Sequence, residues 1–99
     1  MILHRLEFTS KRGCLQEAVA WLKTMAKRPG SLHVRQRICT RCIGRFDTIV
    51  LEIEFKSLAD LETSWAAWFA SPEGAAFNKR WFELTESGAT DQVWTISEW

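Results

Sequence analysis

The chain of 99 residues lacks an excess of charge of either sign, because 13 basic and 12 acidic residues leave a formal net charge of +1. A long-range field that would steer polyphosphate or an anionic membrane toward the protein needs such an excess. The composition therefore argues against nucleic acid as a partner.

Long hydrophobic runs are also missing. No apolar stretch approaches the roughly 20 residues of a membrane-spanning helix, and the first residues, MILHRLEF, carry Arg5 where a secretory signal needs an uninterrupted apolar segment. Cys14, Cys39 and Cys42 are an odd number of cysteines at spacings unlike a secreted disulfide framework. We therefore expect reduced thiols, no membrane span and a cytoplasmic location.

Hydrophobic residues make up 46% of the chain, which suits one compact domain over residues 1–99. Apolar and polar residues alternate over residues 2 to 9, which predicts a half-buried strand. From residue 14 the apolar residues recur at helical spacing up to the stop Pro29-Gly30, which predicts a helix over about residues 14 to 28. A period of two returns from residue 32 and again around residues 49 to 55, which predicts two further strands.

The second helical region begins at Ser57-Leu58-Ala59-Asp60, which resembles a capping box. The stretch from Ser71 to Glu73 then breaks and restarts the helix, because serine can cap it and proline is tolerated at its first position. Gly88 is expected to end the helix, and residues 93 to 99 are expected to form the last strand.

The two middle strands are predicted to form a hairpin closed by a two-residue turn at Gly44-Arg45. Counting outward from this turn, the expected partners are Ile38 with Leu51, Val34 with Phe55, Arg37 with Glu52, and Arg35 with Glu54. Apolar residues meet apolar residues and opposite charges meet. A slip of one residue would destroy both matches, so two independent features of the sequence predict one register.

The element order is βαββαβ, with two right-handed crossovers around the hairpin. This order predicts a ferredoxin-like α+β sandwich, in which a four-stranded antiparallel sheet of order 4-1-3-2 carries both helices on one face.

The segment LEIEFKSLADLETSWAAWFASPEGAAFNKRWFEL runs from a strand into a Trp-rich helix and a Ser-Pro-Glu-Gly restart, and it resembles NIPSNAP-type sequences. Together with the topology, it makes the whole chain similar to the dimeric α/β-barrel superfamily, which includes NIPSNAP-like proteins, stress-responsive barrel proteins and antibiotic-biosynthesis monooxygenases. The resemblance implies a homodimer in which two sheets close face to face into a barrel with the helices outside.

The residues give their own reason to consider a dimer. The sheet face away from the helices is expected to mix charged with apolar residues: Arg5, Glu7, Arg35, Arg37, Glu52 and Glu54 beside Leu3, Val50, Val93 and Trp99. A solvated face with weak surface ion pairs is one reading of this pattern. A face that meets a second copy of the chain explains the apolar members better.

Four aromatic residues of the second helical region are the candidate ligand-binding residues: Trp65, Trp68, Phe77 and Trp81. They share helical stripes with leucines, so packing of the helix on the sheet is the default interpretation. The break at Pro72 would splay the two half-helices, and large rings around such a gap could instead bind a small hydrophobic molecule.

His4 is the candidate catalytic base, because it is the one titratable residue on the apolar face of its strand, although a hydrogen-bonded core histidine is the commoner outcome. His33 is expected on the charged face of the second strand. Because another strand separates the two histidines, they make a poor metal pair, and neither a metal nor a cofactor is predicted. Cys39 and Cys42 match C-x-x-C in spacing only, since their sulfurs should point to opposite faces. Cys39 alone, between Arg37 and Arg41, could be a reactive thiol.

Two related activities are disfavoured. The haem-degrading monooxygenases of this superfamily use an asparagine on the first strand and a later axial histidine, whereas the only asparagine here is Asn78 and no histidine follows His33. An RNA-binding motif on this topology would need aromatic residues on the open face of the third strand, where Val50, Glu52 and Glu54 are expected.

The function predicted from the sequence is the binding of a small apolar or aromatic molecule between the Trp-rich helical region and the sheet. The alternatives are a cofactor-independent monooxygenase or isomerase that uses the same pocket, and a structural association module without a ligand.

Overall fold

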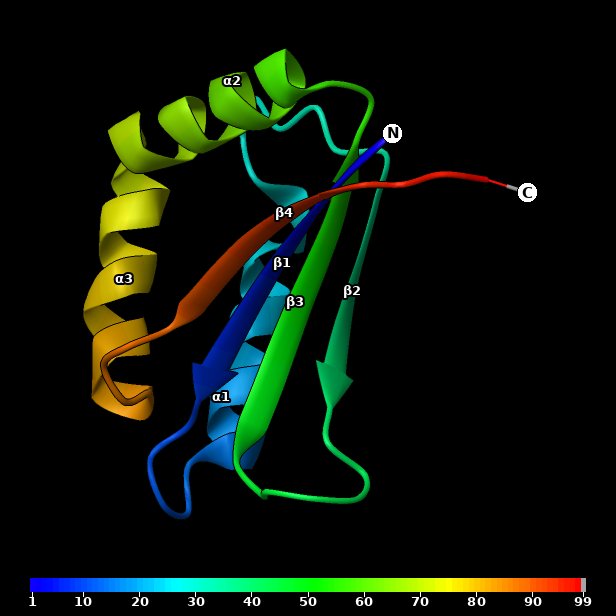
Figure 1. Ribbon diagram of the computed structural model, residues 1–99. Helices are drawn as coiled ribbons and strands as arrows, with labels where there is room; N and C mark the ends of the chain where they lie inside the picture. Colours follow the sequence, from blue (N-terminus) through cyan, green and yellow to red (C-terminus); the bar gives the residue numbers. More distant parts are fainter. Residues whose placement is uncertain (99) are drawn as a thin grey trace.

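The computed structural model describes residues 1–98 and contains four strands and three α-helices (Figure 1). The elements are β1 (Ile2–Thr9), α1 (Leu15–Lys23), the 3₁₀ helix η1 (Thr24–Lys27), β2 (Arg35–Thr40), β3 (Thr48–Phe55), α2 (Leu58–Ala70), α3 (Pro72–Leu84) and β4 (Thr90–Thr95). Within residues 1–98 no helix has the length and apolar character needed to cross a membrane.

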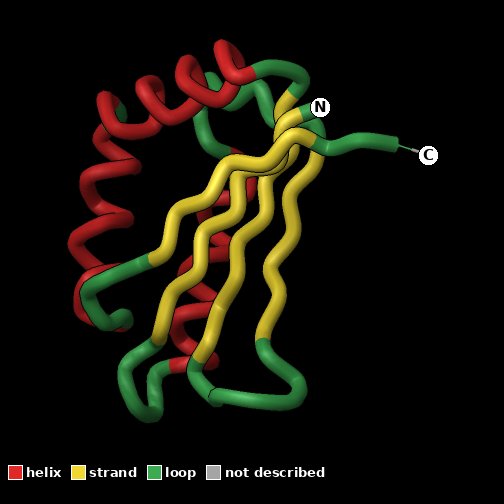
Figure 2. Tube along the Cα trace, viewed as in Figure 1, coloured by secondary structure: helices red, strands yellow, loops and turns green. Residues whose placement is uncertain are grey.

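The sheet has the order β2-β3-β1-β4 and every neighbouring pair is antiparallel. This is the predicted order read from the opposite edge. The helices lie behind the sheet and leave its other face open (Figures 1 and 2). The ferredoxin-like α+β fold predicted from the sequence is therefore confirmed.

The register of the β2–β3 hairpin is also confirmed, since Ile38 pairs with Leu51 and Arg37 with Glu52. The predicted turn is wrong. The ladder ends at Thr40, and residues 41 to 47 form a wider connection in which Gly44 and Asp47 both have positive φ. Apolar pairing deeper in the sheet is sufficient to set the register, so a tight turn is not needed for it.

Strand β4 corrects one predicted face. Trp94 pairs with Leu3, which places Trp94 on the open face, and Val93 pairs with His4 on the helix side. The prediction that Val93 lies on the open face is therefore wrong. Alternation in an edge strand leaves two possible assignments, and only the pairing with β1 selects between them. Trp99, the other predicted member of the open face, lies outside the described residues.

The helix boundaries follow local capping. The Ser57 side chain accepts a hydrogen bond from the Asp60 N–H, and the Ser71 side chain accepts one from the Gly74 N–H. Pro72 occupies the first turn of α3, as predicted. The first helix narrows into η1 at Thr24, and α3 ends at Leu84, before Gly88.

The core lies between the three α-helices and the inner face of the sheet. α3 contacts both α1 and α2, and α2 lies across one end of the sheet so that the two helices meet at a corner (Figure 1). The buried cluster consists of Ala18, Leu22, Met25, Ile49, Leu51, Ile53, Phe55, Leu61, Trp68, Phe77, Trp81 and Leu84. Burial of these side chains is the main source of the fold's stability.

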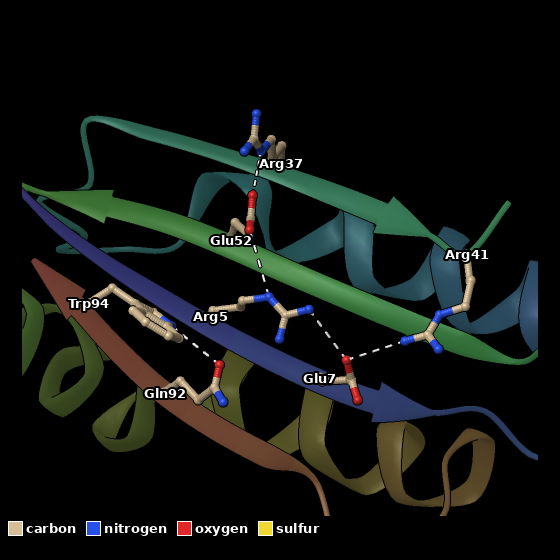
Figure 3. Close-up of polar contacts among 7 residues, drawn as sticks. All are labelled: Arg5, Glu7, Arg37, Arg41, Glu52, Gln92 and Trp94. Atoms are coloured by element: carbon tan, nitrogen blue, oxygen red, sulfur yellow. Dashed lines mark hydrogen bonds and ion pairs between the residues drawn. The ribbon is translucent and has the colours of Figure 1, made fainter. Parts of the chain in front are cut away.

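The open face carries a network of opposite charges (Figure 3). Glu52 accepts a hydrogen bond from Arg37 at 2.5 Å and lies 3.9 Å from Arg5, while Glu7 pairs with Arg5 at 3.4 Å and with Arg41 at 3.7 Å. The hydrogen bond to Glu52 raises the pKa of Arg37 above its ordinary value. Each pair contributes little to stability. The alternation of side chains along the strands places these arginines and glutamates on one side of the sheet.

Candidate functional site

The four aromatic residues predicted to bind a ligand lie together at one cavity between α1, α2, α3 and the sheet. The cavity has a volume of about 250 Å³. Besides the predicted Trp65, Trp68, Phe77 and Trp81, its lining residues are Leu6, Phe8, Leu22, Met25, Leu51, Phe69, Asn78 and Phe82. We call it the aromatic cavity.

Ring contacts hold the walls of the aromatic cavity in place. Phe77 stacks on Trp21 with 5.7 Å between ring centroids and on Trp81 with 5.6 Å. Trp81 in turn meets Phe8 of β1 edge to face at 5.0 Å. Aromatic pairs in these geometries contribute stability beyond their buried area. Rings from α1, α3 and β1 are thus in continuous contact, and those of Phe77, Trp81 and Phe8 line the aromatic cavity.

The indole N–H groups in and around the aromatic cavity differ in their partners. Trp21 donates to the backbone oxygen of Phe77 at 3.1 Å, and Trp65 donates to His4. No fully buried side-chain nitrogen or oxygen lacks a partner within residues 1–98. The N–H groups of Trp68 and Trp81, which donate to no described residue, are therefore within reach of water or a bound molecule.

His4 is buried on the inner face of β1 and is bonded through both ring nitrogens. Its Nδ1 accepts a hydrogen bond from Trp65 Nε1 at 2.8 Å, and its Nε2 lies 2.5 Å from Asp91 Oδ1. Nδ1 must keep its lone pair to accept a hydrogen bond from an N–H. The ring proton is therefore on Nε2, which donates a hydrogen bond to Asp91. His4 is therefore held as the neutral Nε2–H tautomer between α2 and β4.

A second cavity of about 300 Å³ adjoins the aromatic cavity on the β4 side. It is lined in part by His4, Asp91 and Val93, and it shares Leu6, Trp65 and Phe69 with the aromatic cavity. Trp65 and Phe69, whose rings stack at 5.8 Å, thus form a common wall. We call this second cavity the Asp91 cavity.

Two polar residues near the cavities escaped the sequence analysis. Asn78 lines the aromatic cavity, and its position four residues before Phe82 on the same helix was an available signal. Arg28, at the end of the first predicted helix, was given no role from the sequence; it is buried, and its guanidinium lies over the Trp65 ring at 5.5 Å. Burial lowers the pKa of Arg28 to about 10, so it remains charged at neutral pH.

His33 was predicted to lie on the charged face of the second strand. This prediction is wrong, because β2 begins only at Arg35. The imidazole Nδ1 is instead 2.6 Å from the Ser31 hydroxyl in the preceding loop. Burial lowers the pKa of His33, and the nearby charge of Arg28 lowers it further. The two histidines therefore belong to separate parts of the fold.

The three cysteines are free thiols. Cys39 is exposed near the end of β2, and Cys42 lies beyond the strand in the β2–β3 connection. Within the described part of the chain, no group of three His, Cys, Asp or Glu residues could hold a metal ion. The reactive Cys39 thiol remains a prediction.

The fold and the cavities define this chain as a ferredoxin-like α+β protein with an aromatic cavity on the helix side of its sheet. Its sequence matches no family model and no curated protein.

Solved structures share the fold at low sequence identity. An uncharacterized NIPSNAP domain protein from Burkholderia xenovorans matches 98% of this chain and 95% of its own, with a TM-score of 0.82 and 13% identity. A NIPSNAP family protein from Agrobacterium tumefaciens matches 98% and 93%, with a TM-score of 0.82 and 15% identity. The cofactor-independent oxygenase SnoaB from Streptomyces nogalater matches 98% and 93%, with a TM-score of 0.73 and 15% identity. The predicted resemblance to NIPSNAP and monooxygenase-like proteins is confirmed in the fold.

Proposed function

We propose that this protein binds a small apolar or aromatic molecule in the aromatic cavity. The observation that carries the proposal is the convergence of rings from β1, α2 and α3 on one space of about 250 Å³. Ligand sites typically enclose about 300 to 1,000 Å³ and are lined by apolar and aromatic groups with a few polar ones. The ligand is therefore small, or it extends into the adjoining Asp91 cavity.

Exposure at the rim supports binding over simple core packing. Phe69 and Phe82 line the aromatic cavity, yet 66% and 67% of these residues are exposed. Large apolar side chains left in water beside a cavity are typical of a surface that a ligand covers. Asn78 and the indole N–H groups of Trp68 and Trp81 belong to lining residues and are available as polar contacts for the ligand.

The proposal is tested by titration with the neutral fluorescent dye phenylnaphthylamine. We expect saturable binding of one dye per chain, with energy transfer from the tryptophans. Asn78→Trp fills the cavity and should abolish this binding, whereas Lys79→Trp, which adds the same ring at the exposed neighbouring position, should leave it unchanged. Circular dichroism verifies that both variants fold. Absence of dye binding by the native protein, or binding that survives Asn78→Trp, contradicts the proposal.

A second candidate is a cofactor-independent oxygenase or isomerase with His4 as the base. The contact between His4 and Asp91 favours it, because a carboxylate orients an imidazole and stabilises its protonated form. The Trp65 N–H, however, occupies Nδ1, the nitrogen that would take up a proton. Because Nδ1 of His4 is occupied in this way, we prefer ligand binding to catalysis as the proposed function. Consumption of dioxygen in the presence of a bound ligand, lost in His4→Gln, would favour the oxygenase.

We further propose that the working form is a cytoplasmic homodimer that needs no bound cofactor. The free thiols of all three cysteines support a reducing location. The dimer would be formed through the open face of the sheet, where Leu3, Val50 and Trp94 lie among the charged residues.

A further inference from the structure

The Asp91 cavity joins an apolar space to an unneutralised carboxylate. The side chain of Asp91 is 63% exposed, so it is open to a ligand. Its only ion-pair partner within residues 1–98 is His4, which the hydrogen bond from Trp65 holds as a neutral ring. The carboxylate of Asp91 therefore lines the cavity with no Lys or Arg partner among residues 1–98.

The walls beside Asp91 also favour a cation. Phe69 and Trp65 both line the same cavity, and aromatic rings attract ammonium groups. Arg28 already lies over Trp65 at 5.5 Å. The carboxylate must therefore supply most of the attraction, since charge-assisted hydrogen bonds are about twice as strong as neutral ones.

We propose that the natural ligand is a cationic amine with an aromatic or apolar body. The ammonium group would bind to Asp91 beside Phe69, and the body would extend past the shared wall of Trp65 into the aromatic cavity. This inference rests on the proposed function, because it assigns a ligand class to the same site. An anionic ligand is disfavoured by repulsion from Asp91, and a neutral ligand of the same shape lacks the charge-assisted bond.

The experiment compares three molecules with the same ring: phenethylamine, phenethyl alcohol and phenylpropionate. Each competes with phenylnaphthylamine for the protein, and calorimetry checks the affinities. We expect the amine to bind about tenfold more tightly than the alcohol, and the anion more weakly than both.

Two variants locate the selectivity. Asp91→Asn should reduce the preference for the amine over the alcohol to about twofold or less, because the charge-assisted bond is lost. Glu62→Gln, which removes a negative charge from the exposed side of α2, should keep the preference. The inference is overturned if the native protein does not distinguish the amine from the alcohol, or if Asp91→Asn keeps the native preference for the amine.

The two proposals fail in different ways. Dye binding without any preference for the amine leaves the proposed function intact and rejects the amine. Absence of dye binding together with absence of amine binding in calorimetry rejects both.

Discussion

The surroundings of Arg28 are unusual for an arginine. It is buried, yet among residues 1–98 it forms no ion pair with a carboxylate. Its guanidinium donates instead to the backbone oxygen of Met25, to Gln36 and to the Ser31 hydroxyl. These neutral acceptors and the Trp65 ring offset part of its desolvation cost. Arg28 thus ties the loop before β2 to the wall of the cavities.

The neighbouring His33 gives a pH-dependent prediction. Its pKa is lowered from 6.5, so the unfolded chain binds more protons than the folded protein between that value and the lowered pKa. The contribution of neutral His33 to the free energy of unfolding is complete above pH 6.5 and should decrease as the pH falls from 6.5 through the lowered pKa. Urea unfolding between about pH 8 and about pH 5 measures the slope, which His33→Gln should reduce. An unchanged slope in the variant would show that His33 is not responsible.

At the scale of elements, the junction between α2 and α3 determines where the aromatic rings lie. The Trp68 backbone oxygen accepts hydrogen bonds from both the N–H and the hydroxyl of Ser71. The new helix therefore starts at once, in a different direction, and its stripe of Phe77 and Trp81 faces that of Trp68. Two short helices at an angle enclose a space that one straight helix could not.

Gly74 makes this angle possible, because a Cβ at that position would overlap the backbone oxygen of Trp68. Gly74→Ala should therefore destabilise the protein by about 1 to 3 kcal/mol or more, despite the higher helix propensity of alanine. Urea unfolding measures the change. Ser57→Ala, which removes only a cap from α2, is the control and should cost about 1 kcal/mol. A Gly74→Ala protein as stable as the native one would contradict the steric argument.

At the scale of the whole molecule, the open sheet face is the surface available for association. Arginines and glutamates alternate across it, and Trp94 is 52% exposed beside Leu3 (Figure 3). Such a mixed face is complementary to itself, because a two-fold axis can bring the arginines of one copy to the glutamates of the other. A small domain also gains stability when a partner covers one face.

Size-exclusion chromatography with light scattering should therefore give twice the chain mass at micromolar concentration. Trp94→Asp places a charge among the apolar members of the face and should shift the protein to the monomer. Phe46→Asp, at an exposed position in the β2–β3 connection, is the control and should remain dimeric. A native protein that elutes as a monomer would rule out the dimer.

Local patterns in the chain were sufficient for the strand order, the hairpin register, the Ser57 and Ser71 caps and the grouping of the four aromatic residues. Each of these depends on neighbours in sequence or on the alternation of apolar residues, which the amino-acid order contains directly. The turn length, the face of Trp94 and the loop position of His33 were mispredicted, because they depend on the register of β4 against β1 and on where strand pairing begins and ends.

What the sequence by itself determined is the fold and the choice of rings, since burial of periodic apolar residues leaves few other arrangements. Only the tertiary structure placed Asp91 on His4, Arg28 over Trp65 and Asn78 in the aromatic cavity. His4 and Asp91 are 87 positions apart in the chain. Contacts over such separations arise from the packing of whole elements, and the chemistry of the site depends on those contacts.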